Sequence, residues 1–303
     1  MFPPLRTLAI AGFLVTTLLS ATAASAAPHG AVDRHGNRLF DYRRGPVTVH
    51  QISVQDRDGI TIRDITYAGR DGDEVRAYLV EPAGGGRHAA GLYLHWFEPP
   101  NPLSSREEFL DEAVDMARQG MVALLPDLTF PWSIDVVGDR RDLDNVVAQT
   151  VRLRVGLDLL TSRPNVDRKR IAVVGHDYGG MYGLLLSNID RNRISASVAM
   201  NVDATFSNWF AQFFLGLSGD DTIAYEELLG PVDPIRFVGD RGGAPILFQF
   251  AEPDFFVPDS TRRTLVSQAA GPKDYKLYPN AGHELNEAAR TDRTAWLAAR
   301  LRL

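Results

Sequence analysis

The fold of this chain is decided by residues 171–180, which read IAVVGHDYGG. The first four residues form a continuous apolar run, as in a strand that is buried on both faces. Gly175 to Gly179 then fit the G-x-S-x-G nucleophile elbow, with an aspartate, Asp177, at the central position. A sharp strand-to-helix turn holds this central side chain over the end of a sheet, and only glycines fit at the crowded flanks. The stretch therefore predicts an α/β fold with a reactive side chain at Asp177.

Apolar runs on both sides of the elbow predict the rest of the sheet. Runs near residues 49–54, 60–67 and 75–80 are separated by Asp-Gly turn signals, which indicates an antiparallel N-terminal portion. Later runs alternate with helical patterns, and this order indicates a mostly parallel central sheet flanked by helices. The expected strands are 90–94, 121–125, 171–174, 194–202, 245–250 and 275–278, and the expected helices are 104–118, 143–159, 260–269 and 292–301.

The N-terminal residues predict an exported protein. Arg6 is the only charge in the first 26 residues, an apolar run follows at 8–19, and residues 24–26 read Ala-Ser-Ala. Residues 1–26 are therefore predicted to be a signal peptide, with a retained membrane anchor as the alternative. Residues 27–46 are expected to be an arm and residues 47–303 a single domain, in which 205–243 form a short cap insertion. We expect a periplasmic or extracellular protein without stable membrane association after signal removal.

Composition narrows the classes of partner. The chain has no cysteine, which excludes disulfide bonds and a lipid anchor on cysteine. Its net charge is -6, and removal of Arg6 with the signal peptide leaves 31 basic and 38 acidic residues, or -7. This acidity argues against nucleic acid as a partner. The histidines lack metal-ligand spacing and no glycine-rich phosphate loop is present, so we expect no metal and no cofactor. The sequence carries no signal for an oligomeric state.

Partners for Asp177 follow in the chain order of a hydrolytic triad. Asp254 comes just after the strand that ends at Phe250, and His283 follows the last strand. Because ligands of such sheets bind beyond the carboxyl ends of the strands, these side chains are expected to meet there. Asp254 is the preferred orienting acid, and Asp203, which follows the strand at 194–202, is the alternative.

Three backbone N–H groups are candidates for an oxyanion hole. Trp96 and Phe97 come just after the strand at 90–94, and Tyr178 directly follows Asp177. We expect the N–H group of Tyr178 and that of either Trp96 or Phe97 to bind developing negative charge. His95 and His176 are expected to be packed structural histidines.

From about residue 75 onward, these motifs resemble a dienelactone-hydrolase-like branch of the α/β-hydrolase superfamily. The Gly-His-Asp-aromatic-Gly elbow itself resembles epoxide hydrolases and haloalkane dehalogenases. The resemblance implies Asp177 as nucleophile, Asp254 as orienting acid and His283 as base. The chain departs from the Asp enzymes in two ways: only residues 205–243 stand where they carry a larger helical cap, and Tyr178 follows the nucleophile where dehalogenases often have a halide-binding tryptophan.

The sequence therefore predicts a secreted hydrolase of small apolar molecules. Asp177 can attack the saturated carbon of an epoxide, or act on an ester or lactone as nucleophile or base, while His283 activates water. A catalytically inactive α/β-hydrolase-fold binding protein and a dehalogenase are the alternatives. Four aromatic residues are expected either to line a small pocket or cap or to belong to the core: Trp132, Trp209, Phe213 and Phe214.

Overall fold

The computed structural model describes residues 36–69 and 72–303. The predicted signal peptide and the first residues of the predicted arm, 27–35, lie outside these ranges, so export stays a prediction. Within the described ranges no helix is long and apolar enough to cross a bilayer.

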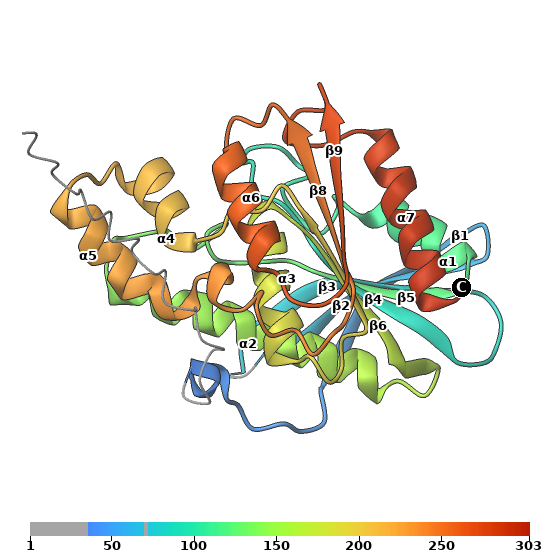
Figure 1. The fold of residues 1–303 in the computed structure, drawn as a ribbon. Coiled ribbons are helices and arrows are strands. Elements are labelled where there is room, and N and C mark those ends of the chain that lie inside the picture. Colours follow the sequence, from blue (N-terminus) through green and yellow to red (C-terminus); the bar gives the residue numbers. More distant parts are fainter. Residues whose placement is uncertain (1–35, 70–71) are drawn as a thin grey trace, which may run out of the picture. The chain divides into compact units, whose positions relative to one another are not determined.

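One sheet of nine strands organises the described residues, in the order β1-β2-β3-β5-β4-β6-β7-β8-β9 (Figure 1). The pairs β1/β2, β2/β3 and β3/β5 are antiparallel, and all the others are parallel. The predicted fold class is confirmed, with its antiparallel N-terminal portion. The strands are β1 Val49–Arg57, β2 Ile60–Ala68, β3 Glu74–Glu81, β4 His88–Leu94, β5 Met121–Pro126, β6 Val166–His176, β7 Ala196–Met200, β8 Ile246–Glu252 and β9 Lys273–Pro279.

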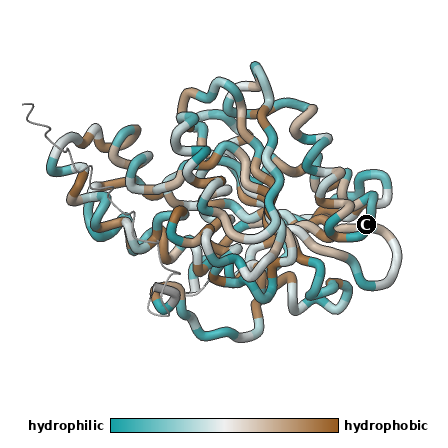
Figure 2. The backbone as a smooth tube through the Cα atoms, in the orientation of Figure 1, coloured by the Kyte–Doolittle hydropathy of each residue, from teal (hydrophilic) through white to brown (hydrophobic). Residues whose placement is uncertain are grey.

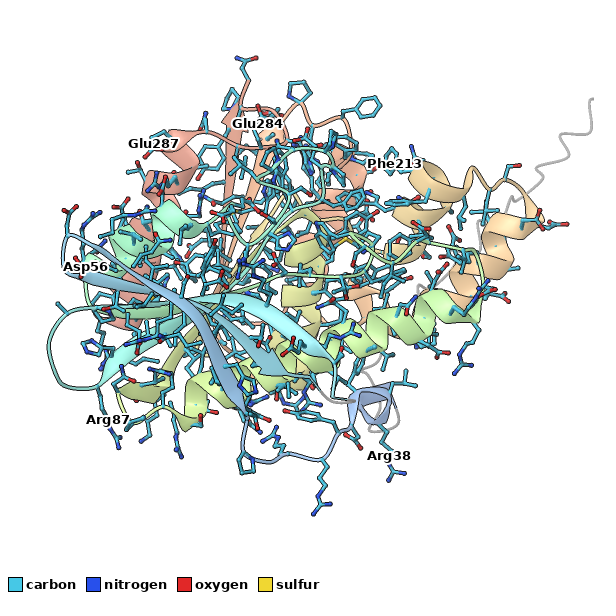
Figure 3. All side chains as sticks on the ribbon, turned by 180° about the vertical axis from the view of Figure 1, so that it is seen from behind. Arg38, Asp56, Arg87, Phe213, Glu284 and Glu287 are labelled. Atoms are coloured by element: carbon cyan, nitrogen blue, oxygen red, sulfur yellow. The ribbon has the colours of Figure 1, made fainter. Side chains whose placement is uncertain are left out.

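Helices cover both faces of this sheet and enclose two apolar cores. One core packs against α2 (Arg140–Ser162), α3 (Asp177–Ile189) and α6 (Asp259–Gln268). The other packs against α1 (Leu110–Arg118) and α7 (Glu287–Leu301). The tube in Figure 2 is brown along the central strands, whose side chains are buried on both faces as their continuous apolar runs predict. Charged side chains such as Arg38, Asp56 and Arg87 extend into solvent (Figure 3).

The segment between β7 and β8 forms a small helical cap (Figure 1). It consists of α4 (Phe206–Trp209), a π-helical turn η2 (Phe210–Leu215), α5 (Asp220–Leu229), and the short turns η3 (Gly230–Val232) and η4 (Pro234–Arg236). The Tyr225 hydroxyl on α5 donates to Asp142 on α2 at 2.6 Å. This bond fixes the cap to the body of the domain.

Two local features differ from the sequence-based expectation. The helix expected from residue 104 begins at Leu110, because the serines before it serve other bonds. The Ser104 hydroxyl accepts from the Glu98 N–H at 2.8 Å, and Ser105 bonds within its own turn. The described part of the predicted arm, 36–46, includes a 3-10 turn and packs on the domain, since Phe40 is fully buried in the first core.

Candidate active site

Asp177 lies where β6 turns sharply into α3, as the elbow motif predicts. Its φ is 56°, in the left-handed region, which aspartate tolerates better than most residues. A Cβ at Gly179 would overlap the carbonyl oxygens of Leu94 and His95 at the end of β4. The glycine therefore lets α3 start directly against the neighbouring strand. This contact places Asp177 beside the loop that follows β4, with only 3% of its surface exposed.

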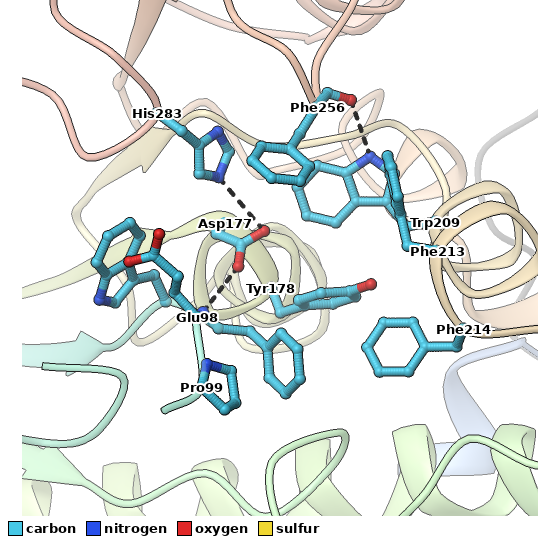
Figure 4. A pocket seen from close by; sticks show the side chains of 11 residues that line it. Glu98, Pro99, Asp177, Tyr178, Trp209, Phe213, Phe214, Phe256 and His283 are labelled. Atoms are coloured by element: carbon cyan, nitrogen blue, oxygen red, sulfur yellow. Dashed lines mark hydrogen bonds and ion pairs between the residues drawn. The ribbon is translucent and has the colours of Figure 1, made fainter. Parts of the chain in front are cut away.

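Each oxygen of the Asp177 carboxylate faces a different group (Figure 4). Oδ2 accepts a hydrogen bond from the Phe97 N–H at 2.8 Å. Oδ1 lies 3.7 Å from His283 Nε2, which is ion-pair distance and longer than a hydrogen bond. The carboxylate is thus fixed through one oxygen, while the other borders the cavity and the imidazole.

Asp254 is the carboxylate that holds the other side of the imidazole. Its Oδ2 lies 2.8 Å from His283 Nδ1, and its Oδ1 accepts from the N–H groups of Phe256 and Val257 at 2.7 and 3.0 Å. Burial raises the pKa of Asp254, but the hydrogen bond and charge of His283 and the N–H groups of Phe256 and Val257 together outweigh it and hold this pKa below its usual value. Asp203 instead accepts from the Thr205 N–H at 2.9 Å, just before α4, and burial raises its pKa to about 6. The orienting contact therefore comes from Asp254.

The two carboxylates change the charge of His283. Burial alone would lower its pKa, but the nearby Asp177 and Asp254 carboxylates together outweigh that effect and raise the pKa to about 9. The ring is therefore an imidazolium at neutral pH when Asp177 is ionised.

The loop after β4 decides between the two oxyanion-hole alternatives. The Phe97 N–H donates to Asp177, whereas the Trp96 N–H donates to Glu108 Oε2 at 2.7 Å. Of the two alternatives, it is the Phe97 N–H that faces Asp177, because the Trp96 N–H is bonded to Glu108. The Tyr178 N–H belongs to the first turn of α3, where backbone donors have no partner inside the helix. Phe97 and Tyr178 thus remain as the candidate donors.

Glu108 is a site residue that the sequence did not reveal. Besides the Trp96 N–H, its carboxylate contacts His176 Nδ1 at 2.7 Å, and His176 Nε2 lies 2.8 Å from the His283 carbonyl oxygen. His176 is thus buried behind the site. Burial lowers the pKa of His95 to about 4, and its Nε2 accepts from the Leu128 N–H at 2.9 Å, so its ring is neutral and packed.

An aromatic cavity of about 260 Å³ opens above Asp177 (Figure 4). The predicted aromatic residues Trp209, Phe213 and Phe214 line it, but Trp132 does not. Trp132 packs behind Phe97, with ring centroids 5.7 Å apart, and donates to the Trp96 carbonyl at 2.9 Å. The lining residues are Trp96, Phe97, Glu98, Pro99, Asp177, Tyr178, Trp209, Phe213, Phe214, Phe256 and His283, with no arginine or lysine among them.

No cluster of three or more His, Asp or Glu side chains with metal-binding geometry occurs among residues 36–69 and 72–303. Asp177 and His283 line the cavity, and Asp254 contacts His283 Nδ1 behind it. This arrangement provides a nucleophile or base, a proton carrier and an orienting acid.

Together, the parallel sheet, the elbow and the strand-end histidine define an α/β hydrolase. The sequence profile of the Dienelactone hydrolase family matches residues 105–300. Because this match spans more than half of the chain, the protein belongs to the dienelactone hydrolase family and is a hydrolase of that type. The expected family resemblance is confirmed.

Individual relatives are more distant. A "Probable 2-oxo-3-(5-oxofuran-2-ylidene)propanoate lactonase" from Bradyrhizobium sp. is 25% identical over 242 residues, which cover 73% of this chain and 83% of that protein. The acetyl xylan esterase structure from Paenibacillus sp. R4 shares 20% identity with a TM-score of 0.68, covering 88% of this chain and 92% of that one. Acetyl Xylan Esterase 1 from Thermoanaerobacterium sp. JW/SL YS485 shares 16% identity with a TM-score of 0.71, covering 89% and 93%. These two structures support the fold.

Proposed function

We propose that this protein hydrolyses small, uncharged, apolar lactones or esters, with Asp177 as the attacking group. The family and the lactonase name of the Bradyrhizobium relative support the substrate class. The observation that carries the proposal is the position of the Asp177 carboxylate at the floor of an aromatic cavity, with one oxygen bonded to the Phe97 N–H and the other beside His283.

In the first step the imidazolium of His283 acts as an acid. Because it is already protonated at neutral pH, it cannot take a proton from water while Asp177 is charged. Asp177 Oδ1 bonds to the electrophilic carbon of the substrate, and the bond from that carbon to the ring or ester oxygen breaks. The departing oxygen takes the proton from His283 Nε2. Asp177 is now acylated and uncharged, and His283 is neutral.

In the second step His283 acts as a base. Loss of the Asp177 charge removes one of the groups that raised the His283 pKa, so the neutral ring can accept a proton. Water attacks Asp177 Cγ and gives this proton to Nε2, while negative charge forms on Oδ2, where the Phe97 N–H donates. Collapse releases the product carboxylate with the former Oδ1 and leaves the oxygen of water in Asp177. Asp177 then gives the second proton of that water to solvent, which restores the Asp177 carboxylate beside the His283 imidazolium.

Epoxide opening is a second candidate, and one contact favours it. The Phe97 N–H donates to the Asp177 carboxylate itself, so it can stabilise the negative charge that forms when an ester on Asp177 is hydrolysed. Attack on a saturated epoxide carbon gives such an ester directly, whereas attack on a carbonyl gives a more reactive mixed anhydride. Tyr178 stands where a dehalogenase would carry a halide-binding tryptophan, which disfavours dehalogenation.

The lining of the cavity indicates an uncharged substrate. Glu98 and Asp177 are acidic, and the described lining residues include no arginine or lysine to bind a carboxylate. The His283 imidazolium already faces the Asp177 and Asp254 carboxylates. Aromatic ring faces also repel anions. The name of the Bradyrhizobium relative specifies a propanoate, and we expect such carboxylated lactones to be poor substrates here.

The test is a panel of uncharged lactones, p-nitrophenyl esters and epoxides, combined with the His283→Gln variant. Glutamine keeps an N–H donor but cannot take a proton from water, and p-nitrophenolate leaves without an acid. We expect intact-protein mass spectrometry to show an adduct that maps to Asp177 in His283→Gln and is absent from Asp177→Asn/His283→Gln.

Each part of the proposal can fail separately. If the parent hydrolyses no member of the panel, the proposed function is wrong and a binding role is favoured instead. If it turns over lactones but His283→Gln carries no adduct, Asp177 acts as a base on water and not as a nucleophile. For the orienting acid, Asp254→Asn should lower kcat strongly, and Asp203→Asn, the control at the alternative acid, should not.

A further inference from the structure

Behind the site, one buried pair contacts all three segments that the proposed hydrolysis requires. Glu108, two residues before α1, accepts from the Trp96 N–H in the loop after β4 at 2.7 Å. Its other oxygen contacts Nδ1 of His176, which directly precedes Asp177, at 2.7 Å. His176 Nε2 lies 2.8 Å from the carbonyl oxygen of His283. The pair thus connects the oxyanion loop, the elbow and the histidine loop.

The protons in this pair can be counted. A carbonyl oxygen only accepts hydrogen bonds, so His176 Nε2, which faces the His283 carbonyl, must carry a hydrogen. One further proton must lie between Nδ1 and the Glu108 carboxylate, since two facing lone pairs would repel. Whichever atom carries that proton, the pair has no net charge. Its effect on the site is therefore one of geometry.

That geometry fixes the proposed oxyanion donor and the base. Because Glu108 takes the Trp96 N–H, the loop is held so that the next N–H, that of Phe97, reaches Asp177. The His283 carbonyl accepts from His176 and also from the Asn201 side chain, so the backbone of His283 is held while Asp254 holds its ring. The rings of Trp96 and His176 also stack, with centroids 5.2 Å apart and planes 9° apart.

We propose that Glu108 and His176 are positioning residues for hydrolysis, which align the Phe97 N–H, Asp177 and His283 from one buried point. This inference rests on the proposed function. The side chain of His176 is 2% exposed and that of Glu108 13%, so His176 is buried and Glu108 mostly so, and neither lines the cavity. A buried pair of this kind contributes little net stability compared with apolar side chains, which makes a role in alignment the better reason for its presence.

The test compares Glu108→Leu with Glu108→Gln. Leucine removes both hydrogen bonds, so Phe97 should lose its alignment, and kcat should fall about 10²-fold, the loss seen when one oxyanion donor is removed. KM should change by less than about threefold, because no side chain that lines the cavity is replaced. Glutamine can accept from the Trp96 N–H and donate to Nδ1 of a neutral His176, so it should recover most of the kcat.

Glu112→Leu is the matched control. Glu112 lies on α1 and pairs with Arg293 of α7 at 2.8 Å, with 3% of its surface exposed and no contact with the site. Both leucine variants should lower the melting temperature, but only Glu108→Leu should lower kcat. Equal kcat in the two variants, a change in KM alone, or equal losses for Glu108→Gln and Glu108→Leu would each overturn the positioning role.

A readout that needs no substrate separates this inference from the proposed function. Glu108→Leu should shift the NMR signals of the Phe97 amide and of the His283 ring N–H, and Glu112→Leu should leave both in place. If the parent protein shows no hydrolytic activity, the proposed function fails, while unchanged NMR signals in Glu108→Leu would refute the positioning claim independently.

Discussion

Replacing Asp177 with asparagine tests the charge balance on which the proposed mechanism depends. The asparagine would keep the shape of the side chain and tolerates positive φ, but it is uncharged, as Asp177 is after acylation. The His283 pKa of the variant therefore mimics that of the intermediate. In the parent this pKa is raised to about 9 from a usual 6.5, by two carboxylates acting against burial.

The expected magnitude follows from the geometry. Asp177 Oδ1 lies 3.7 Å from Nε2, and the His283 side chain is only 12% exposed, so solvent screens the pair weakly. Two unit charges at this distance interact by about 4 kcal/mol at an effective dielectric constant of about 20, which corresponds to up to ~3 pKa units. The net shift is smaller, because burial of the ring and its other partners also affect the His283 pKa. We expect Asp177→Asn to lower the His283 pKa by about 2, toward 7.

The same change has a pH-dependent effect on stability. A histidine whose folded pKa is raised stabilises the protein fully below the unfolded value of 6.5, and this stabilisation is lost as pH rises through about 9. For the parent it amounts to about 3 kcal/mol, and Asp177→Asn should remove most of it. The difference in unfolding free energy between parent and variant should therefore be about 2–3 kcal/mol larger at low pH than at high pH.

The assay is an NMR titration of the His283 ring nitrogens in both proteins, with urea unfolding at pH 6 and pH 10 beside it. A parent pKa near or below 7, or a pKa that Asp177→Asn leaves unchanged, would refute the charge balance. The proposed switch of His283 from acid to base would then have no physical cause.

Three further results are expected. Gly179→Ala should lower the unfolding free energy by about 2 kcal/mol or more, because its Cβ would overlap backbone oxygens at the end of β4. In Gly183→Ala, the control on the same helix, the Cβ meets a side chain at 3.2 Å, so the loss of unfolding free energy measured by chemical denaturation should be smaller. Phe214→Arg should raise kcat/KM for a carboxylated lactone and lower it for the uncharged parent lactone; no change in this ratio would contradict the charge argument. The rate of lactone hydrolysis should decline above about pH 9 as His283 loses its proton. Single-turnover acylation by a p-nitrophenyl ester should not decline, and if both rates depend on pH in the same way, His283 is not the acid.

Local patterns in the sequence predicted the fold because each type of strand has its own characteristic pattern of apolar and polar residues. The run at 171–174 is apolar throughout, as required of a strand covered on both faces, and the elbow glycines mark where backbones approach. The order of β5 and β4 in the sheet could not be read in this way, since it depends on pairing between distant segments. The start of α1 was misplaced because Ser104 bonds to the loop after β4 and does not cap the helix.

The site was predictable where a residue's place after a strand defines it. Asp177, Asp254 and His283 follow three strands whose carboxyl ends share one edge, and the structure brings their side chains together. Glu108 gave no signal, because it lies in a stretch that reads as an amphipathic helix and meets His176 across 68 residues. The choice between Trp96 and Phe97 likewise depends on which way two consecutive N–H groups point.

The most direct test of the central claim follows the oxygen of water through one turnover. Enzyme in excess over an uncharged lactone reacts once in water enriched in oxygen-18, and the product and the peptide that contains Asp177 are analysed by mass spectrometry. We expect heavy oxygen in the Asp177 carboxylate and none in the first product, because water attacks Cγ of the acylated aspartate. Heavy oxygen in the product with an unlabelled Asp177 would contradict it.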